Sequence, residues 1–430
     1  MTSGIGKPSS ALWVVTELYY PEETSTGHFM TGIAEGLVDR FRVHVLCAQP
    51  TYSERGRRAP EREVREGVDI RRVWSTTLSN LRAGGRLANL ATVTISLFLH
   101  SLAKLRAGDL VLVVSTPLLL PIAIGSACFL RRARIVVLVH DSYPEVLVAA
   151  GVTTSSSLLA RCLDLANRLL YRFAQRVVVL GRGMQQRVRA KLPAQEADKI
   201  QVIRTWADVD LIHPRPREAN NLLQDLKLVD KFVVLYAGNI SRLYDIDNVL
   251  AAMGVVGGGE DVHFLFAGRG GKRDHLLREI DRRGLQNASV LDWLPQSETH
   301  ELHGACDVVL IPLIPGMGGV SVPSRLYNSL ASGRPVIAAT EESSELARIV
   351  SEEEVGWVVE PGNAQALAQA VAEAASDPSR LRVMGARARE AAEKRFSRSR
   401  IIGEWLSLLE ELETPNSHPD SGRSGPAAES

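Results

Sequence analysis

Short apolar runs alternate with stretches of helical periodicity along nearly the whole chain, and this alternation limits what the chain can fold into. The strand-like runs fall at residues 12–16, 42–47, 69–74, 110–115, 135–140, 177–180, 201–204, 232–237, 263–267, 289–291, 308–312, 336–339 and 356–359. Strands that alternate with helices form parallel sheets covered by helices on both faces. The sequence therefore predicts an α/β protein with Rossmann-like parallel sheets.

The length of the chain predicts two domains. It has 430 residues, of which 45% are hydrophobic, and a single core stops growing at about 250–300 residues. The segment ADVDLIHPRPREAN, residues 207–220, combines prolines with charge and lacks apolar periodicity, as linkers do. We therefore expect one domain at residues 11–207 and a second at residues 221–396.

The end of the chain predicts one more helix and a tail. Ile401, Trp405, Leu408 or Leu409, and Leu412 recur at helical spacing and give one apolar face to a helix over residues 397–413. Residues 414–430 have almost nothing to bury and are predicted to be disordered.

Charge is distributed unevenly between the halves. Residues 1–210 hold 27 Lys and Arg against 18 Asp and Glu, a net charge of +9, whereas residues 211–430 hold 23 against 31, a net charge of −8. A basic half indicates an anionic partner, and a membrane surface or a lipid-phosphate acceptor fits better than nucleic acid. The alternative is that the arginines only keep a large domain soluble.

A helical stripe in residues 85–107 bears on the same question. Its apolar residues are flanked by basic side chains and recur at steps of three and four: Leu87, Ala91, Ile95, Phe98, Leu102 and Leu105. Such a helix either packs on its own sheet or lies on a membrane surface. Both readings stay open at this point.

The cysteines and the first residues bear on location. Cys47, Cys128, Cys162 and Cys306 lie apart in apolar surroundings, without the spacing of a disulfide framework or a zinc site, which implies a reducing compartment. Residues 1–10 lack the pattern of a signal peptide, and no uninterrupted apolar segment reaches the ~18 residues that span a bilayer. We expect a cytoplasmic protein that can attach peripherally to the inner face of the membrane.

The segment VPSRLYNSLASGRPVIA, residues 322–338, has the layout of a diphosphate pocket. Pro323 fixes φ near a helix start, Ser324 can cap that helix, and free N–H groups of the first turn face an anion. Arg325 adds a permanent positive charge, and Gly333 permits a left-handed cap at the end of the helix.

This segment resembles the donor-site motif of the GT-B glycosyltransferases of family 4, in the branch that builds bacterial surface polysaccharides. The resemblance extends from about residue 11 to about residue 412 and implies two facing Rossmann-like domains, with the final helix crossing back onto the first. Family members often carry two glutamates eight positions apart, where this chain has Val320 and Asn328. The Asn328 amide can still bind a ribose hydroxyl, but Val320 cannot contact a sugar or phosphate by charge.

Two loops complete the expected donor site. The apolar run 232–237 stops at Gly238. Family members commonly have an arginine directly after this glycine and a lysine five residues later, where this chain has Asn239 and Tyr244. Arg242 lies between these two positions and can supply the missing positive charge. The loop after Glu17 resembles the GT-B loop that closes over the diphosphate, with its helix expected near Met30. By resemblance the donor contacts are Gly27, Gly238, Asn239, Ser241, Arg242, Leu294, Pro323, Ser324, Arg325 and Asn328.

His140 and Asp141 are the candidate catalytic residues. They follow the apolar run 135–139, at the edge where open α/β sheets bind ligands, and either side chain can accept a proton from an attacking hydroxyl. They resemble the family segment beside the transferred sugar. The DxD sequences at residues 208–210 and 245–247 lie in the linker and at a helix start, so we expect both to be structural.

These observations predict a glycosyltransferase that moves a sugar from a nucleotide diphosphate donor, a UDP-sugar, to a lipid-linked or other glycan acceptor. The resemblance implies retention of anomeric configuration, and we expect no metal or other cofactor. A dehydrogenase is disfavoured because residues 268–271 and 181–183 do not complete GxGxxG. A UDP-sugar 2-epimerase of the same fold and a non-catalytic saccharide-binding scaffold remain as alternatives.

Overall fold

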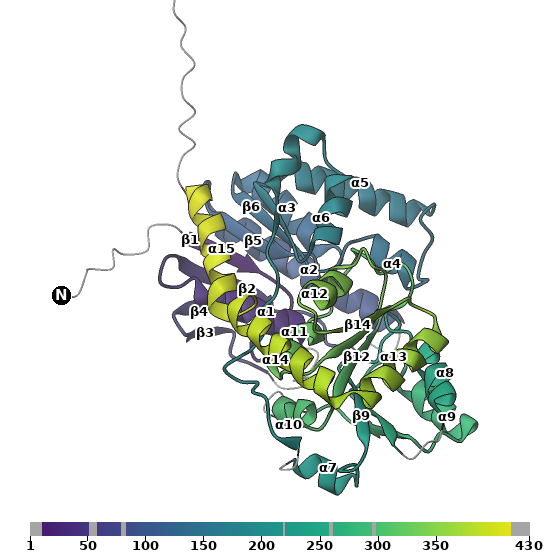
Figure 1. Ribbon diagram of the computed structural model, residues 1–430. Coiled ribbons are helices and arrows are strands. Elements are labelled where there is room, and N and C mark those ends of the chain that lie inside the picture. The colour runs from purple at the N-terminus through teal and green to yellow at the C-terminus, as the bar shows by residue number, and fades with distance from the viewer. Residues whose placement is uncertain are drawn as a thin grey trace, which may run out of the picture.

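The structure, a computed structural model, describes residues 11–50, 58–78, 83–217, 220–257, 261–294 and 298–413. Its strands form two sheets, one in each half of the chain (Figure 1). The predicted tail, residues 414–430, lies outside the described residues. The prediction of an α/β protein with parallel Rossmann-like sheets is confirmed.

The first sheet has eight strands in the order β3-β4-β2-β1-β5-β6-β7-β8. Their bounds are β1 Ala11–Val15, β2 Arg42–Ala48, β3 Arg62–Arg65, β4 Val68–Val73, β5 Leu110–Val114, β6 Arg134–Val139, β7 Arg176–Val179 and β8 Ile200–Val202. All pairs are parallel except β3 with β4. The edge strand β3 was not predicted, because Val64 is its one apolar residue and is exposed.

The second sheet has six parallel strands in the order β11-β10-β9-β12-β13-β14. Their bounds are β9 Phe232–Ala237, β10 Val262–Ala267, β11 Ala288–Leu291, β12 Val308–Pro312, β13 Val336–Ala339 and β14 Gly356–Val359. Every residue of β12 and β13 is buried. Such continuous apolar runs are typical of parallel strands with helices on both faces.

Helices connect the strands in both halves. The first half contains α1 Ser25–Gly36, α2 Ala83–Lys104, α3 Leu120–Arg131, α4 Glu145–Ala149, α5 Leu158–Phe173, α6 Arg182–Arg189 and the short 3₁₀ helix η1 Ala194–Lys199. The second contains α7 Asn221–Asp225, α8 Ile246–Val256, α9 Arg273–Arg283, α10 Thr299–Gly304, α11 Arg325–Ala331, α12 Glu345–Glu352, α13 Ala364–Ser376, α14 Pro378–Lys394 and α15 Arg398–Glu413. In the first half α2 packs on α3, and α3 on α5.

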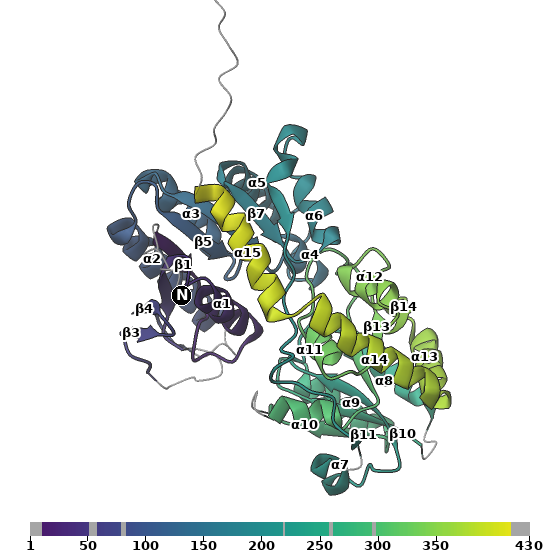
Figure 2. The same ribbon diagram turned by 60° about the vertical axis from the view of Figure 1, so that its left-hand side comes forward.

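The last helix, α15, returns to the first half of the chain and packs against α1 (Figure 2). Its buried side chains include Ile401, Trp405 and Leu408, as the predicted apolar face requires. Contact with α1 is close: a Cβ on Gly36 would lie 2.8 Å from the side chain of Ile402. The predicted crossing of the final helix onto the first domain is confirmed.

An ion-pair cluster joins α12 to the first half of the chain. The Glu345 carboxylate, 1% exposed, accepts from Arg182 Nε at 3.1 Å and from the Arg182 backbone N–H at 2.8 Å, and it pairs with Arg204 Nη2 at 2.8 Å. Burial opposes ionisation of Glu345, but the bonds from Arg182 and Arg204 prevail and hold its pKa below the usual value. Packing is tight beside the cluster, since a Cβ on Gly181 would lie 2.6 Å from Glu345 Cβ.

We expect Glu345→Gln to cost about 2 kcal/mol of unfolding free energy, because it removes the charge that two arginines share. The cost stays below that of a fully buried pair since Arg182 and Arg204 keep 32% and 29% of their side chains in water. Because the folded-state pKa of Glu345 is lowered, its contribution is present above the unfolded pKa and is lost as pH falls. Urea unfolding at pH 7 and at lower pH measures both effects.

A matched control is Glu354→Gln, whose carboxylate pairs with Arg387 at the surface, where both side chains are exposed. This change is expected to cost less than about 1 kcal/mol. Equal costs for the two variants would show that the Glu345 cluster does not hold the two halves together.

Candidate active site between the two sheets

Two loops from opposite halves of the chain meet by backbone contacts. Asp141, which follows β6, forms an isolated bridge with Ser321, and the Ser142 N–H donates to the Val320 carbonyl oxygen at 2.9 Å. Val320 itself is buried, with 1% of its surface exposed. Val320, at the position where the family often has a glutamate, therefore packs between the two halves of this chain. An apolar side chain suits this buried position.

Arg325 is the most unusual charged residue at this junction. Its guanidinium carbon lies 4.4 Å from the ring centroid of Tyr236 and 4.1 Å from that of Tyr244. Nη2 donates to the Asn239 carbonyl oxygen at 3.4 Å, and the buried Nη1 has no hydrogen-bond partner among the described residues. A buried charge is normally paired. In the described part of the chain, the N–H groups of Nη1 therefore lack the hydrogen-bond acceptor that a buried charge normally has.

Gly238 makes room for this arrangement. Its φ of 117° is rare for other residues, and a Cβ there would lie 3.1 Å from Arg325 Nη2. Tyr236 Oη also donates to the Asn239 carbonyl oxygen, at 2.7 Å. Of the predicted donor residues, the structure thus brings Gly238, Asn239 and Arg325 together.

The helix that follows, α11, departs from the prediction at its start. Ser324 occupies the N-cap position, but its side chain accepts no capping hydrogen bond, so the expected cap is wrong. The reason is its helical φ and ψ of −63° and −23°, because a capping serine needs extended backbone. Pro323 lies just before it and is buried. At the other end Gly333 has φ of 64°, as predicted.

The loop after β9 also departs from the prediction. The side chain of Arg242 is exposed, and no hydrogen bond or ion pair joins it to another residue in the described part of the chain. The start of α8 is occupied by its own acid, since the Asp245 carboxylate accepts from the Asn248 N–H at 3.1 Å. The structure therefore does not bring the Arg242 side chain into the cluster around Arg325, whereas Tyr244, one residue before the α8 cap, belongs to that cluster.

The other predicted donor residues are placed as follows. Ser241 Oγ accepts from the Leu243 N–H at 3.3 Å, which folds the loop on itself. Leu294 is half-buried and packs against the main hydrophobic core. Asn328 is half-buried on α11, and its side chain forms no hydrogen bond with the residues that the structure describes. Its amide is thus available at the surface of α11.

The first loop is shorter than predicted, because α1 begins at Ser25 rather than near Met30. Thr24 caps the helix, accepting from the Gly27 N–H at 3.2 Å. Gly27 therefore lies in the first turn, where a Cβ would come within 2.7 Å of the Glu22 carbonyl oxygen. The glycine is needed for this close backbone approach.

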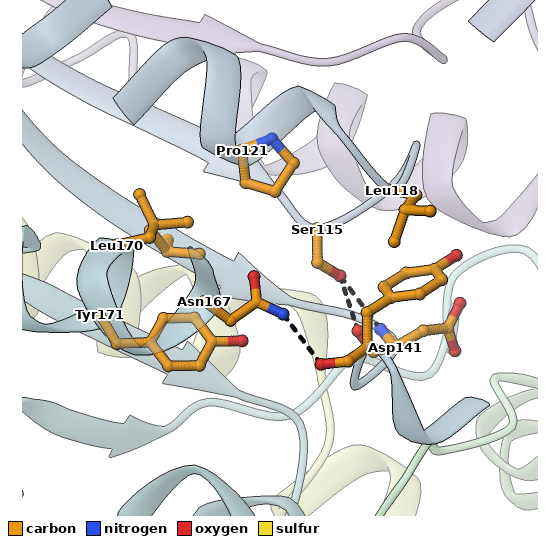
Figure 3. A pocket seen from close by; sticks show the side chains of 9 residues that line it. Ser115, Leu118, Pro121, Asp141, Asn167, Leu170 and Tyr171 are labelled. Carbon is orange, nitrogen blue, oxygen red and sulfur yellow. Dashed lines mark hydrogen bonds between the residues drawn. The ribbon is translucent and has the colours of Figure 1, made fainter. Parts of the chain in front are cut away.

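Asp141 lines a small hollow at the end of β6 (Figure 3), and His140 directly precedes it in the chain. Ser115 fixes their backbone: its Oγ lies 3.0 Å from the His140 N and donates to the Asp141 carbonyl oxygen at 3.0 Å. Asn167 Nδ2 from α5 donates to the Tyr143 carbonyl oxygen at 2.8 Å. The loop that carries both candidate catalytic residues is therefore held by α5 and by β5's end.

Burial sets the protonation of these two side chains. It lowers the pKa of His140 to about 4, so the imidazole is neutral at pH 7. Its Nδ1 lies 3.5 Å from Thr26 Oγ1, and Nε2 has no partner among the described residues. Burial also raises the pKa of Asp141, against a hydrogen bond from Ser321 that lowers it. A raised pKa makes the Asp141 carboxylate a stronger base.

Glu17 is a candidate that our sequence reasoning did not select. It follows β1, and burial, with a smaller contribution from the Glu22 charge, raises its pKa to about 7. Burial raises the pKa of Tyr143, and the charges of Asp141 and Glu17 raise it further, so the three groups interact. The signal was available, because Glu17 is a charged residue directly after an apolar strand, the same pattern that drew attention to His140.

We expect Glu17→Gln to stabilise the fold at pH 8. The folded-state pKa is raised from 4.5 to about 7, so the carboxyl costs stability as pH rises through this window, up to about 3 kcal/mol. An amide is also desolvated, so the net gain at pH 8 is about 2 kcal/mol, and it vanishes near pH 4. Urea unfolding of both proteins at the two pH values measures it; a gain that does not change with pH would contradict this assignment.

The two DxD sequences have local partners. Asp208 accepts from Trp206 Nε1 at 2.9 Å and pairs with His28 Nε2 at 2.9 Å. Asp245 caps α8, and Asp247 contacts Lys272 and His275 at 3.3 and 2.6 Å. These contacts fit the structural reading of both sequences.

The cysteines differ in environment. Cys47, Cys128 and Cys306 are buried, whereas Cys162 is exposed on α5. All four are free thiols.

Comparisons with known proteins agree with this architecture. The model of the family "Glycosyl transferase 4-like domain" matches residues 26–206, and that of "Glycosyl transferases group 1" matches residues 220–391. WbjE of Pseudomonas aeruginosa, described as a probable glycosyltransferase, is 32% identical over 63% of this chain and 67% of its own length. WcaI of Escherichia coli (strain K12), described as a colanic acid biosynthesis glycosyl transferase, is 24% identical over 90% of this chain and 97% of its own length.

Solved structures show the same fold. Anabaena HepE in complex with UDP and glucose aligns with a TM-score of 0.69 at 18% identity, covering 93% of this chain and 99% of that one. WaaG, a glycosyltransferase involved in lipopolysaccharide biosynthesis, aligns with a TM-score of 0.65 at 15% identity, covering 93% and 99%. With both family models in sequence on the two sheets, the chain belongs to the glycosyltransferases of family 4 with the GT-B fold.

Proposed function

We propose that this glycosyltransferase moves a sugar from a UDP-sugar to a glycan acceptor carried on a lipid, in the synthesis of a cell-surface polysaccharide. The observation that carries the proposal is Arg325, a guanidinium held between Tyr236 and Tyr244 with Nη1 unpaired among the described residues. A guanidinium matches the oxygen geometry of a diphosphate. Arg325 follows Ser321 of the Asp141–Ser321 bridge by four residues, so we expect an anion bound to it near the candidate catalytic loop.

The reaction changes two bonds at the anomeric carbon and one at the acceptor oxygen. The acceptor oxygen bonds to the anomeric carbon on the same face from which the diphosphate oxygen departs, so that the configuration is retained, and the acceptor hydroxyl loses its proton. Asp141 receives that proton, because burial raises its pKa and makes it the stronger base. His140, neutral at pH 7, uses its unpaired Nε2 to hold a sugar hydroxyl. Arg325 stabilises the charge that develops on the departing diphosphate.

The choice of donor and pathway rests on relatives. HepE was solved with UDP and glucose and with UDP-glucose, and WcaI is described by its place in colanic acid biosynthesis. Asn328 on α11 is available to bind the ribose. Family membership favours transfer over the two alternatives, a UDP-sugar 2-epimerase and a non-catalytic scaffold.

We further propose that transfer retains the anomeric configuration, needs no metal and takes place in the cytoplasm. The family resemblance supports retention. Asp208, Asp245 and Asp247 of the DxD sequences are engaged with local partners, and the described residues contain no group of three His, Cys, Asp or Glu side chains placed to hold a metal ion. In this proposal the positive charge of Arg325, rather than a metal ion, stabilises the negative charge on the leaving diphosphate.

The test begins with a thermal-shift panel of nucleotides, since a bound ligand stabilises in proportion to the logarithm of its concentration over Kd. We expect UDP and UDP-sugars to raise Tm and GDP, ADP and CMP to have little effect. Turnover of the preferred UDP-sugar, followed by UDP release, is expected to continue in the presence of EDTA. Loss of turnover with EDTA would overturn the metal-free step, and a folded protein indifferent to every nucleotide would overturn the proposed donor class.

A further inference from the structure

The three adjacent helices α2, α3 and α5 carry an unusual amount of exposed apolar surface. Large hydrophobic side chains that are more than half exposed occur on all three: Leu87, Ile95, Leu99, Phe129, Leu130, Leu158, Leu159, Leu165 and Leu169. The helices pack side by side, and a ring contact between Phe129 and Phe173 at 5.8 Å joins α3 to α5. We call these nine residues the outer helical face. Exposed apolar side chains in a contiguous group mark an interaction surface.

On α5 the pattern is clearest. Leu158, Cys162, Leu165 and Leu169 follow one another at steps of four, three and four, so they share one side of the helix, and all are exposed. The opposite side is already buried in the fold, with Leu163, Asn167 and Leu170 among its residues. A helix with apolar residues on both sides has more apolar surface than its own domain covers.

The apolar stripe that the sequence predicts on α2 is not the side that packs on the domain. The side that packs on the domain carries Val93 and Leu97, whereas Leu87, Ala91 and Ile95 of the predicted stripe are exposed. The stretch Gly84–Lys104 has a mean hydropathy of 1.2, long and apolar enough by composition to cross a bilayer, yet it lies along the domain with 22% of its residues buried. We therefore read α2 as a surface helix that adds to the outer helical face.

Charge on these helices selects the kind of partner. The three helices contain six basic residues, all exposed, namely Arg86, Lys104, Arg131, Arg161, Arg168 and Arg172, against a single acid, Asp164. Two copies of this surface facing each other would bring like charges together, which disfavours a dimer. An apolar surface bordered by arginines fits an anionic bilayer, where the side chains enter the headgroup region and the guanidiniums meet lipid phosphates.

We propose that the outer helical face docks the enzyme onto an anionic phospholipid bilayer. This inference goes beyond the proposed function, because adhesion to lipid requires neither donor nor turnover. Its link to catalysis is α5, whose buried Asn167 holds the Tyr143 carbonyl oxygen in the loop of Asp141 while Leu165 and Leu169 face outward. One helix diameter, about 10 Å, thus separates the candidate catalytic loop from the lipid surface, within reach of an acceptor anchored there.

The test measures sedimentation of the full chain with vesicles of phosphatidylcholine alone and of phosphatidylcholine with phosphatidylglycerol. We expect binding to the anionic vesicles that weakens as salt rises. The variant Leu158→Ser/Leu165→Ser/Leu169→Ser is expected to bind these vesicles at least about tenfold more weakly, because its apolar anchors are lost. All three side chains are exposed in the fold, so its Tm and UDP binding are expected to match those of the parent protein.

The second domain offers a matched control. The variant Val255→Ser/Leu277→Ser/Val383→Ser removes three exposed apolar side chains from separate helices there and is expected to bind vesicles as the parent does. Equal binding by both triple variants, or no binding of the parent to anionic vesicles at low salt, would overturn the proposal. A dimer in sedimentation velocity that the α5 variant alone dissociates would also overturn it and assign the surface to a second copy.

Discussion

An Arg325→Ala variant is expected to bind UDP at least about tenfold more weakly and to lose about 100-fold or more in kcat/KM, with little loss of fold stability. One charged contact is worth about 1.4 kcal/mol or more in binding. A donor aimed at charge that develops in the transition state contributes about 2.7–4 kcal/mol to the rate. Calorimetry with UDP, donor kinetics and urea unfolding measure the three quantities.

Stability is what separates a ligand-binding arginine from a structural one. Removing one partner of a buried ion pair costs several kcal/mol, because the other charge is left uncompensated. Arg325 contacts two tyrosine rings and one carbonyl oxygen, with no ion pair to a carboxylate in the part of the chain described by the structure. Its removal therefore forfeits cation–π attraction but also relieves a desolvated charge.

Two further variants sharpen the result. Arg387→Ala removes a surface arginine of the same domain and is expected to change neither UDP affinity nor stability beyond about 1 kcal/mol. Arg242→Ala tests the sequence prediction directly, since the structure leaves Arg242 exposed: an unchanged UDP affinity is expected. If Arg325→Ala bound UDP as tightly as the parent protein, the donor diphosphate would lie elsewhere.

The contrast between Arg325 and Arg242 shows which site residues can be predicted from the sequence. Arg325 was found because Pro323, the helical pattern and Gly333 fix a strand–helix–strand unit locally, and local signals are readable from spacing. Arg242 was chosen only because its position lay between two family positions. Whether a side chain points into a cluster depends on contacts across the sheet, such as those of Tyr236 and Tyr244 with Arg325, which spacing does not encode.

Buried strands could be predicted from their apolar residues, whereas the strand β3 could not, because it has only one. The buried parallel strands are continuous apolar runs, so β5, LVLVV, is evident from composition alone. The strand β3 has charged residues on both sides of Val64 and is held by pairing with β4 and by an ion pair between Arg65 and Glu35 of α1. Its pairing partner, not its own sequence, decides its conformation.

The start of α1 and the role of Val320 illustrate a second limit. Gly27 suggested a loop, but α1 begins before it, at the Thr24 cap. A glycine is needed at this position because the backbone passes close to the Glu22 carbonyl oxygen. Val320 looked like a lost functional residue, yet its burial and its carbonyl bond to Ser142 show a contact between halves. Both corrections concern tertiary contacts, which a single sequence does not contain.

An Asp141→Asn variant is expected to lose about 100-fold or more in kcat while UDP affinity stays within about threefold. A positioned general base contributes 10²–10⁴-fold, and an amide of the same shape keeps the bridge to Ser321 but cannot take a proton. Because burial disfavours the charged carboxylate, the amide is expected not to destabilise the fold. Donor kinetics, calorimetry with UDP and urea unfolding test these expectations together.

The pH profile of kcat distinguishes a base from a residue that only positions its neighbours. With Asp141 ionised as the reactive form, activity of the parent protein rises with pH through a pKa above the usual carboxyl range, because burial raises it. The residual activity of Asp141→Asn is expected to lack this rise, while Asp198→Asn, an exposed acid of the same domain, retains it. A parent-like profile in Asp141→Asn would move the base to another group, and Glu17, with its pKa near 7, is then the carboxyl to replace.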